Sequence, residues 1–371
     1  MTKKVLHIFG AMNRGGAEMR TVSLMPGMNE KHVSFDYCVL SGLQGVLDDE
    51  ICSLGGRIHY LPLGPMFVFQ FISMLRKENY EVVHSHVAMV SGFILLLARL
   101  SGVKIRIAHF RNTTDGENQS RLRRLRNTFL RGLIRLCATD ILGVCRGALD
   151  GFLRHDWKND DKCQVIYNGF EIPNIPFRQD FWSQYINDYD GQKIILNVSR
   201  MDFQKNHLRQ VDIFFEMQKR VPDCLLVFVG KPNPERMTQL EKRLSELGIK
   251  HKIKVLGLQT QVLDFMLHAD LMLFPSLWEG LPGVVLEAAS VGLDVVASNL
   301  PGVYEISEYI PGVSIVKLSS GDKEWADMLV AKLHEVEQLG AQHQPIRIEQ
   351  FSRSLFKLSE NVQQLYAIYS R

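Results

Sequence analysis

Apolar residues recur along the chain in short runs that are separated by amphipathic stretches. In the first half, the runs predict strands at Val5–Phe9, Ser34–Leu40, Val82–His84, Ile105–Ala108, Ile141–Val144 and Val165–Tyr167. In the second half, they predict strands at Ile194–Val198, Leu225–Val229, Ile253–Leu256, Leu271–Phe274, Val295–Ala297 and Ser314–Val316. Helical patterns lie between several of these runs, and strands that alternate with helices predict parallel sheets covered on both faces.

The alternation stops between residues 169 and 192, where Pro173, Pro176 and several polar residues predict a linker. We therefore expect an α/β protein of two doubly wound domains, over residues 1–173 and 174–347. A long helical pattern occupies Ile348–Tyr369. Doubly wound sheets bind ligands at the carboxyl ends of their strands. The cleft between the two domains is therefore the expected active site.

Composition excludes several classes of protein. The chain has 371 residues, of which 46% are hydrophobic and 22% charged, and its formal net charge of +3 is too small to indicate nucleic-acid binding. The six cysteines lack the spacing of a zinc site or a disulfide framework. The longest apolar run, Phe93–Ala98, is too short to span a bilayer. We expect a cytoplasmic protein, or one that is peripheral at the inner face of the membrane.

Positive charge is concentrated in one stretch, RLRRLRNTFLRGLIRLC, where six arginines and no acid lie between Arg121 and Arg135. Apolar residues recur through it at helical spacing: Leu122, Leu125, Phe129, Leu133 and Leu136. Two interpretations are open. The helix could turn this stripe toward the core and its arginines outward, or residues 121–136 could attach to anionic lipid headgroups.

The stretch FPSLWEGLPGVVLEA, residues 274–288, has the pattern of a ligand site. A strand ends at Phe274, a loop rich in glycine and proline follows, and a helix is expected to open near Gly283. Its free N–H groups and dipole could hold a diphosphate, and Gly280 and Gly283 would allow close approach of the backbone. Glu279 and Glu287 could accept hydrogen bonds from sugar or ribose hydroxyls. Taken singly, each glutamate is equally compatible with an ordinary capping acid.

Two further loops follow expected strands. In NVSRMDFQKNH, residues 197–207, Arg200 and Lys205 could neutralise a diphosphate leaving group, although solvated cations at a domain edge are the plain alternative. In GAMNRGGAE, residues 10–18, Gly15–Gly16 opens a helix in a turn that could contact a phosphate. The turn lacks the GxGxxG pattern, so a simple tight turn is the competing interpretation.

Together these segments resemble the family 4 retaining glycosyltransferases, especially the bacterial members that build capsule, exopolysaccharide and lipid-linked glycans. The resemblance covers nearly the whole chain and rests on Gly15–Gly16–Ala17–Glu18, His84–Ser85–His86, Ile166–Tyr167–Asn168–Gly169, Arg200 with Lys205–Asn206, Phe228–Val229–Gly230, Leu256–Gly257, Pro275–Ser276, Glu279–Gly280 and Glu287. The two glutamates match the family's pair with seven residues between them.

The resemblance implies a GT-B fold, in which two Rossmann-like domains face each other across a cleft and the last segment, 348–371, returns to the N-terminal domain. Arg200 and Lys205 would contact the donor phosphates, Glu279 the donor sugar and Glu287 the ribose. Gly16 would lie against the β-phosphate. The remaining donor contacts would come from the loop backbone at Gly280, Leu281, Pro282, Gly283 and Val284.

The implied reaction moves a sugar, with retention, from a nucleoside-diphosphate sugar to a hydroxyl of a glycan or lipid-linked saccharide. UDP is the expected nucleotide, attack is on the front face, and the departing phosphate takes the acceptor's proton. No cofactor and no metal are expected. His84 and His86 share a face but lack an evident third ligand, and the DxD pattern at Asp188–Tyr189–Asp190 lies in the expected linker, where a solvated turn is the simpler interpretation.

One position departs from the family pattern. Many relatives carry a histidine near the reacting sugar where this chain has Arg111, within IAHFRNT. The only nearby histidine is His109, which shares a face with Arg111 in an extended segment, so either could be the catalytic contact. An arginine cannot act as a base, but it could bind an acidic acceptor or the leaving phosphate.

Two rival functions remain at this stage. A sugar-nucleotide epimerase would share the fold and the donor site. A protein that binds a nucleotide sugar without catalysis would fit the arginine at position 111.

Overall fold

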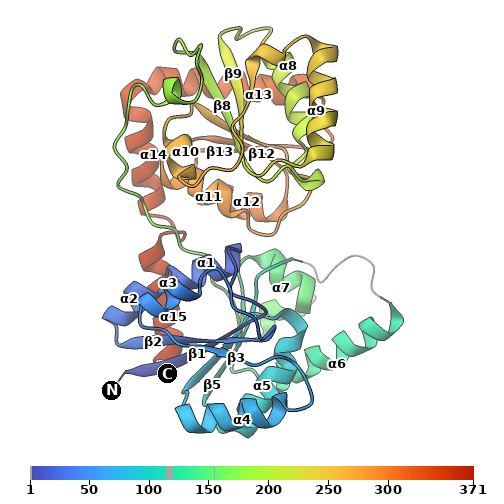
Figure 1. The fold of residues 1–371 in the computed structure, drawn as a ribbon, viewed down its shortest axis with the longest axis vertical. Coiled ribbons are helices and arrows are strands. Elements are labelled where there is room, and N and C mark those ends of the chain that lie inside the picture. Colours follow the sequence, from blue (N-terminus) through green and yellow to red (C-terminus); the bar gives the residue numbers. More distant parts are fainter. Residues whose placement is uncertain (1, 114–119, 154) are drawn as a thin grey trace. The chain divides into compact units, whose positions relative to one another are not determined.

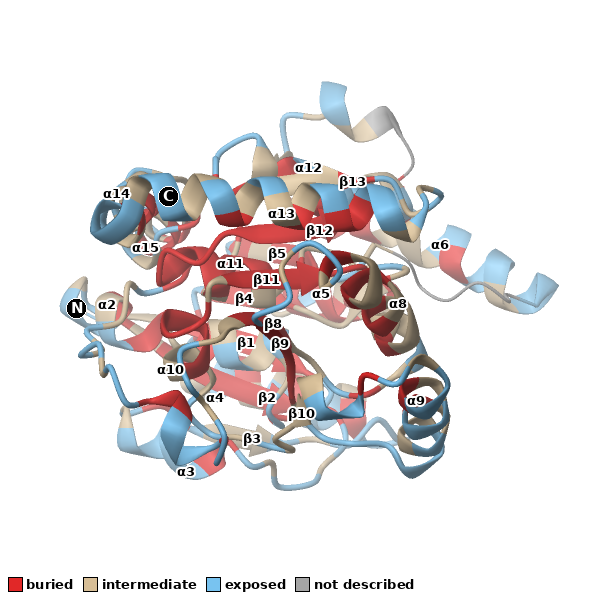
Figure 2. Ribbon diagram, turned by 90° about the horizontal axis from the view of Figure 1, so that it is seen from above, coloured by how far each residue is buried: buried red, intermediate tan, exposed pale blue. Residues whose placement is uncertain are grey.

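The computed structural model describes residues 2–113, 120–153 and 155–371, and the chain divides into two compact units (Figure 1). Unit 1 comprises residues 1–169 together with residues 358–371, and unit 2 comprises residues 170–357. Both are α/β layers built around a parallel sheet. Figure 2 shows the central strands buried and many helices exposed on their outer faces, as alternating strands and helices predict.

Unit 1 holds a seven-stranded sheet in the order β3-β2-β1-β4-β5-β6-β7. Its strands are β1 (Lys3–Phe9), β2 (Val33–Val39), β3 (Ile58–Tyr60), β4 (Val82–Ser85), β5 (Ile105–Phe110), β6 (Asp140–Gly143) and β7 (Cys163–Val165). Its α-helices are α1 (Gly16–Val22), α2 (Met25–Glu30), α3 (Asp48–Ser53), α4 (Phe67–Glu78), α5 (Ser91–Leu100), α6 (Arg121–Cys137), α7 (Arg146–Leu153) and α15 (Leu358–Tyr369).

Unit 2 holds a six-stranded sheet in the order β10-β9-β8-β11-β12-β13. Its strands are β8 (Lys193–Val198), β9 (Cys224–Val229), β10 (Ile253–Val255), β11 (Leu271–Phe274), β12 (Val295–Ser298) and β13 (Val313–Val316). Its α-helices are α8 (His207–Met217), α9 (Pro234–Leu247), α10 (Val262–Leu267), α11 (Gly283–Ser290), α12 (Pro301–Ser307), α13 (Asp322–Leu339) and α14 (His343–Ser352).

Each sheet has the strand order of a doubly wound fold, with a topological switch point near its middle. In unit 1 the chain order reverses between β1 and β4, and in unit 2 between β8 and β11. Connections that leave such a pair run to opposite sides of the sheet, so a crevice opens at the carboxyl ends of the two strands. The loops that follow these four strands are therefore where each unit should bind a ligand.

The segment expected to be a linker is in fact folded onto unit 2. Phe181 and Trp182 are buried there. The Trp182 indole donates to the carbonyl oxygen of His268 at 2.6 Å, and the Arg178 amide donates to the ring of the same histidine at 2.8 Å. These two aromatic residues, which follow Pro176, explain this packing, because they bury apolar area that a free linker would expose. Asp188 and Asp190 are exposed at a turn.

The long helix expected over Ile348–Tyr369 is wrong, because α14 ends at Ser352 and α15 begins at Leu358. Residues 348–357 stay with unit 2, whereas α15 packs on unit 1. There, Asn361 donates to the carbonyl oxygen of Tyr167 at 2.7 Å, and the Tyr369 hydroxyl lies 2.7 Å from His84 Nδ1. Among the described residues, no helix is both long enough and apolar enough to cross a bilayer.

Candidate functional site

An ion pair occupies the switch point of unit 2. Lys205 follows β8, Glu279 follows β11, and Lys205 Nζ lies 2.6 Å from Glu279 Oε1. The two side chains are 16% and 12% exposed, so the pair is largely screened from water but still reachable. Lys205 Nζ also lies 5.4 Å from the centre of the Phe274 ring. We call these two residues the Lys205–Glu279 pair.

Hydrogen bonds between the two loops hold the pair in place. The Leu277 amide donates to the carbonyl oxygen of Gln204 at 2.9 Å, and the Gln204 side chain donates to the carbonyl oxygen of Trp278 at 2.5 Å. Asn206, in a left-handed backbone conformation, donates to the carbonyl oxygen of Pro275 at 3.2 Å. All three bonds are accepted by backbone carbonyl oxygens, so they tie the two loops that carry Lys205 and Glu279 to each other.

A neutral histidine supports the loop after β8. His207 is buried, and its ring lies 3.2 Å from the Ser199 hydroxyl, which donates to Asn197 at 2.6 Å. Burial, with the positive charge of Lys205, lowers the pKa of His207 to about 4. Gly230 has φ +145°, and a Cβ there would clash with the carbonyl oxygen of Ser199, so only glycine fits beside this loop.

Helix α11 begins directly after the glutamate loop. Its N-cap residue, Pro282, makes no side-chain hydrogen bond to the first turn, because a proline side chain has no acceptor atom. Of the five residues expected to bind donor through the backbone, Pro282 cannot donate because proline has no N–H. Glu287 lies in the second turn and is partly exposed. Gly280 packs so closely on Gly302 that a Cβ at Gly302 would clash with its carbonyl oxygen.

Arg200 lies on the same loop as Lys205 but on its surface. Its side chain is 73% exposed and pairs with Asp202 at 3.2 Å. An exposed ion pair of this kind contributes little to stability. The guanidinium can therefore swing toward an anionic ligand at little cost.

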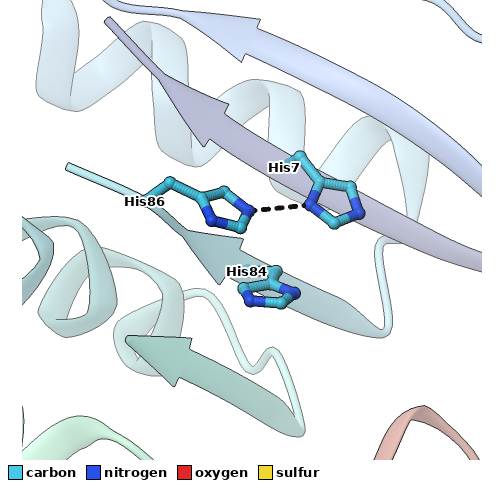
Figure 3. A group of neighbouring side chains, drawn as sticks. All are labelled: His7, His84 and His86. Atoms are coloured by element: carbon cyan, nitrogen blue, oxygen red, sulfur yellow. Dashed lines mark hydrogen bonds between the residues drawn. The ribbon is translucent and has the colours of Figure 1, made fainter. Parts of the chain in front are cut away.

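The switch point of unit 1 holds a cluster of four histidines, three buried and one partly exposed, that the sequence analysis found only in part. His7 on β1 pairs in register with His84 on β4, and His86 follows that strand (Figure 3). His7 Nδ1 lies 3.0 Å from His86 Nε2, and His84 Nε2 lies 3.0 Å from Nδ1 of His109 on β5. We call these four residues the histidine cluster. His7 was missed, although it lies in an expected strand as His84 does; His109 directly follows one.

Arg111 sets the tautomers of two of these rings. Its Nε donates to His86 Nδ1 at 3.1 Å, and a guanidinium can only donate. A neutral His86 must then carry its proton on Nε2, where it donates to His7 Nδ1. His7 in turn carries its proton on Nε2, a buried atom for which the described residues offer no partner.

The histidine cluster is neutral near pH 7. Burial is the main cause that lowers the pKa of each ring well below its usual range, and the charge of Arg111 adds to it. Arg111 as a whole is partly exposed, and burial of its guanidinium lowers the pKa to about 10, so the group stays charged near pH 7. Arg111 also donates to Asn168 at 2.6 Å and to Thr21 at 3.3 Å. An arginine has five N–H donors, so these contacts leave capacity for an anionic ligand.

His109 is only 2% exposed, and its Nε2 is a buried atom without a partner in the described parts of the chain. Its ring lies against His84, whereas Arg111 lies against His86. The two side chains thus share the face expected from their spacing. A direct contact between His109 and a sugar would require its ring to leave the His84 contact, and its catalytic role stays a prediction.

Nitrogen atoms of His7, His84 and His86 lie within 4.8 Å of one another, which makes them a candidate metal group. Their chemistry does not fit a divalent cation. His86 uses one nitrogen to accept from Arg111 and the other to donate to His7, so it has no lone pair left for a metal. The adjacent guanidinium would also repel the cation. The cluster is better suited to orienting Arg111.

The glycine turn near the N-terminus begins α1, with Gly15 as its N-cap and Gly16 as its first residue. A Cβ at Gly15 would meet the folded-back carboxylate of Glu18, whereas a Cβ at Gly16 would meet nothing within 4 Å. Because the Glu18 side chain can move aside, packing inside unit 1 requires glycine at neither position.

Comparisons with known proteins identify relatives of both halves. The family model named Glycosyltransferase Family 4 matches residues 14–172, and the model named Glycosyl transferases group 1 matches residues 178–316. The capsular polysaccharide biosynthesis glycosyltransferase CapH of Staphylococcus aureus is 35% identical over 88% of this chain and 89% of CapH. The UDP-Gal:alpha-D-GlcNAc-diphosphoundecaprenol alpha-1,3-galactosyltransferase of Escherichia coli is 25% identical over 62% of this chain and 60% of its own.

Among solved structures, HepE of Anabaena in complex with UDP superposes with a TM-score of 0.82 over 99% of both chains, at 15% sequence identity. At that identity the likeness concerns the fold alone, which is GT-B.

Proposed function

Because the chain belongs to glycosyltransferase family 4 and is a glycosyltransferase, we propose that it moves a sugar from a UDP-sugar to a hydroxyl of a glycan or lipid-linked saccharide. The product would be a cell-surface polysaccharide such as a capsule. The names of CapH and the Escherichia coli galactosyltransferase support this acceptor class, and HepE, which binds UDP, supports the nucleotide.

The observation that carries the proposal is the Lys205–Glu279 pair beside the start of α11, at the switch point of unit 2. Lys205 would bind the donor's β-phosphate, with Arg200 swinging in from its surface position. Glu279 would accept hydrogen bonds from the donor sugar, and Glu287 from the ribose. The backbone N–H groups of Gly280, Leu281, Gly283 and Val284 would add donors, which suits a diphosphate at a helix N-terminus.

In the proposed reaction, the bond between the anomeric carbon and the β-phosphate oxygen breaks. The acceptor oxygen bonds to that carbon from the same face, and the departing phosphate oxygen takes the acceptor's proton, so configuration is retained. Lys205 and Arg200 would stabilise the charge on the leaving diphosphate without a metal. This route needs no protein base, which agrees with an arginine at position 111 and with histidines whose lowered pKa values make them weak bases.

Unit 1 would supply the acceptor side. Arg111 would bind an anionic oxygen of the acceptor or of the donor diphosphate, and Gly16 would lie against the β-phosphate. The histidine cluster would hold the guanidinium in place, with His109 in the catalytic contact only if its ring moves. We propose a cytoplasmic location, with residues 121–136 in peripheral contact with a membrane that carries the acceptor.

A thermal-shift panel tests donor binding. We expect UDP and one UDP-sugar at about 100 times their dissociation constants to stabilise the protein by about 2.7 kcal/mol. At the same concentration as UDP, UMP should stabilise the protein far less, because UMP lacks the β-phosphate that Lys205 would bind. Lys205→Ala should remove the advantage of UDP over UMP, whereas Lys250→Ala, at an exposed lysine of the same unit, should keep it. Equal stabilisation by UMP and UDP in the native protein would contradict the proposed site.

A further inference from the structure

Helix α6 packs on unit 1 through only one of its faces. Asn127, Ile134 and Cys137 are buried, and a Cβ at Gly92 of α5 would clash with the carbonyl oxygen of Leu130, so the two helices lie in close contact. Arg99 of α5 also donates to the carbonyl oxygen of Leu136 at 2.8 Å. Contact with α5 therefore fixes which side of α6 faces outward.

The outward side carries the apolar stripe. Four of its five members are between 63% and 81% exposed: Leu122, Leu125, Phe129 and Leu136. The fifth, Leu133, is partly buried where α6 meets Gly92 of α5. The spacing of the four exposed residues, by three, four and seven positions, places them on one face of the helix. The interpretation of the stripe as part of the core is therefore wrong for these four residues, and α6 buries Asn127, Ile134 and Cys137 instead. In Figure 2 most of α6 is exposed.

Four large apolar side chains along one helix face form an unusual surface for a monomeric protein. The helix also carries six arginines and no acid over its 17 residues. Arg121, Arg124, Arg126 and Arg135 are exposed, and on a helical projection they flank the apolar stripe on both sides. An apolar face bordered by cations is typical of helices that lie in the interface of an anionic membrane.

We propose that α6 is a membrane-docking helix, which inserts Leu122, Leu125, Phe129 and Leu136 into an anionic lipid bilayer while its arginines contact lipid phosphates. The docking role rests on the proposed function, because α6 would hold the enzyme at the membrane that carries a lipid-linked acceptor. A second copy of the chain is a poor occupant, because the face would bring two rows of arginines together without a carboxylate. An anionic bilayer satisfies both the apolar stripe and the charge.

Co-sedimentation of the full chain with vesicles tests the charge. We expect binding to vesicles with about 30% anionic lipid, and steep loss of binding as salt rises. Each exposed arginine should contribute about 1 kcal/mol, or about fivefold in partitioning. The triple variant Arg121→Gln, Arg124→Gln, Arg126→Gln should therefore bind roughly 100-fold more weakly. A charge-matched control has exposed lysines of unit 2 replaced: Lys242→Gln, Lys250→Gln and Lys323→Gln.

A second pair of variants tests insertion. Leu125→Ser with Phe129→Ser should lower vesicle binding at least tenfold, and Leu258→Ser with Phe177→Ser, at similarly exposed positions of unit 2, should leave it unchanged. Equal loss of vesicle binding in the arginine triple variant and in the lysine triple control would overturn the proposal, and so would vesicle binding that does not change with salt. So would a vesicle-free dimer that Phe129→Ser disrupts, because the occupant would then be a second copy.

Donor binding separates this inference from the proposed function. Every α6 variant should keep the native thermal shift with UDP. A native protein that binds vesicles but is not stabilised by UDP would overturn the donor site and support the docking helix. A native protein that is stabilised by UDP but does not bind vesicles would overturn the docking helix and support the donor site.

Discussion

Acidification should destabilise unit 1 through its histidine cluster. His7, His84 and His109 are at most 2% exposed, and burial lowers the pKa of each well below the value of about 6.5 that a histidine has in an unfolded chain. Arg111, in contact with the cluster, adds a positive charge that opposes protonation. The folded unit therefore keeps these rings neutral while the unfolded chain protonates them.

The sign and size follow from linkage. A depressed folded pKa gives stability that is complete above the unfolded pKa and declines as the pH falls below it, because the unfolded state then binds more protons. As the pH falls from about 7.5 to about 5.5, each ring that stays neutral in the folded unit lowers the free energy of unfolding by about 1.4 kcal/mol. Three such rings together cost about 4 kcal/mol, a large part of the stability of an ordinary domain. His86, which is partly exposed, is left out of this figure.

Hydrogen exchange of the amides in β1, β4 and β5 reads the stability of unit 1 without interference from unit 2. We expect the opening free energy, corrected for intrinsic exchange, to fall by about 4 kcal/mol over that pH range. His109→Gln, which removes one titrating ring, should reduce the loss by about 1.4 kcal/mol. Unchanged protection between the two pH values would refute the assignment of neutral buried rings, as would histidine titrations near pH 6.5 in the folded protein.

Three further results are expected. Glu279→Gln should weaken the binding of the UDP-sugar, while UDP alone binds as well or better because Lys205 is released from its partner. Glu287→Ala should weaken the binding of both ligands alike. Identical binding profiles for the two variants would mean that the roles of the two glutamates are misassigned. Arg111→Ala should mainly raise the KM for donor or acceptor, whereas His109→Ala should lower kcat more than tenfold if its ring reaches the sugar; native kinetics in both variants would remove both residues from the reaction. Turnover should survive EDTA, and complete loss that manganese restores would contradict charge stabilisation by Lys205 and Arg200.

Much of the sheet architecture could be predicted because fully buried parallel strands leave continuous apolar runs. β3 was missed because Ile58–Tyr60 is short, lies at the sheet edge and is only half-buried. The run 165–167 predicted the last strand of unit 1 slightly late, since β7 spans Cys163–Val165. Periodicity also could not tell which apolar face of α6 is buried, because that depends on how α5 approaches it.

Parts of the candidate site could also be predicted from the sequence, and other parts could not. The loops that carry Lys205 and Glu279 could be predicted from their sequence, but their direct pairing depends on β8 lying next to β11, which no local pattern reveals. The histidine cluster likewise needs β1, β4 and β5 side by side. The available signal was a histidine within or directly after each of three expected strands, and His7 was one of them.

Release of UDP tests the central claim most directly. The native protein should release UDP from one UDP-sugar only when a lipid-linked saccharide is present, with one glycosylated product per UDP. Lys205→Ala should lose this turnover, and the control Lys250→Ala should retain it. Formation of a free, altered UDP-sugar without any acceptor, or equal turnover in the Lys205→Ala variant, would contradict the account.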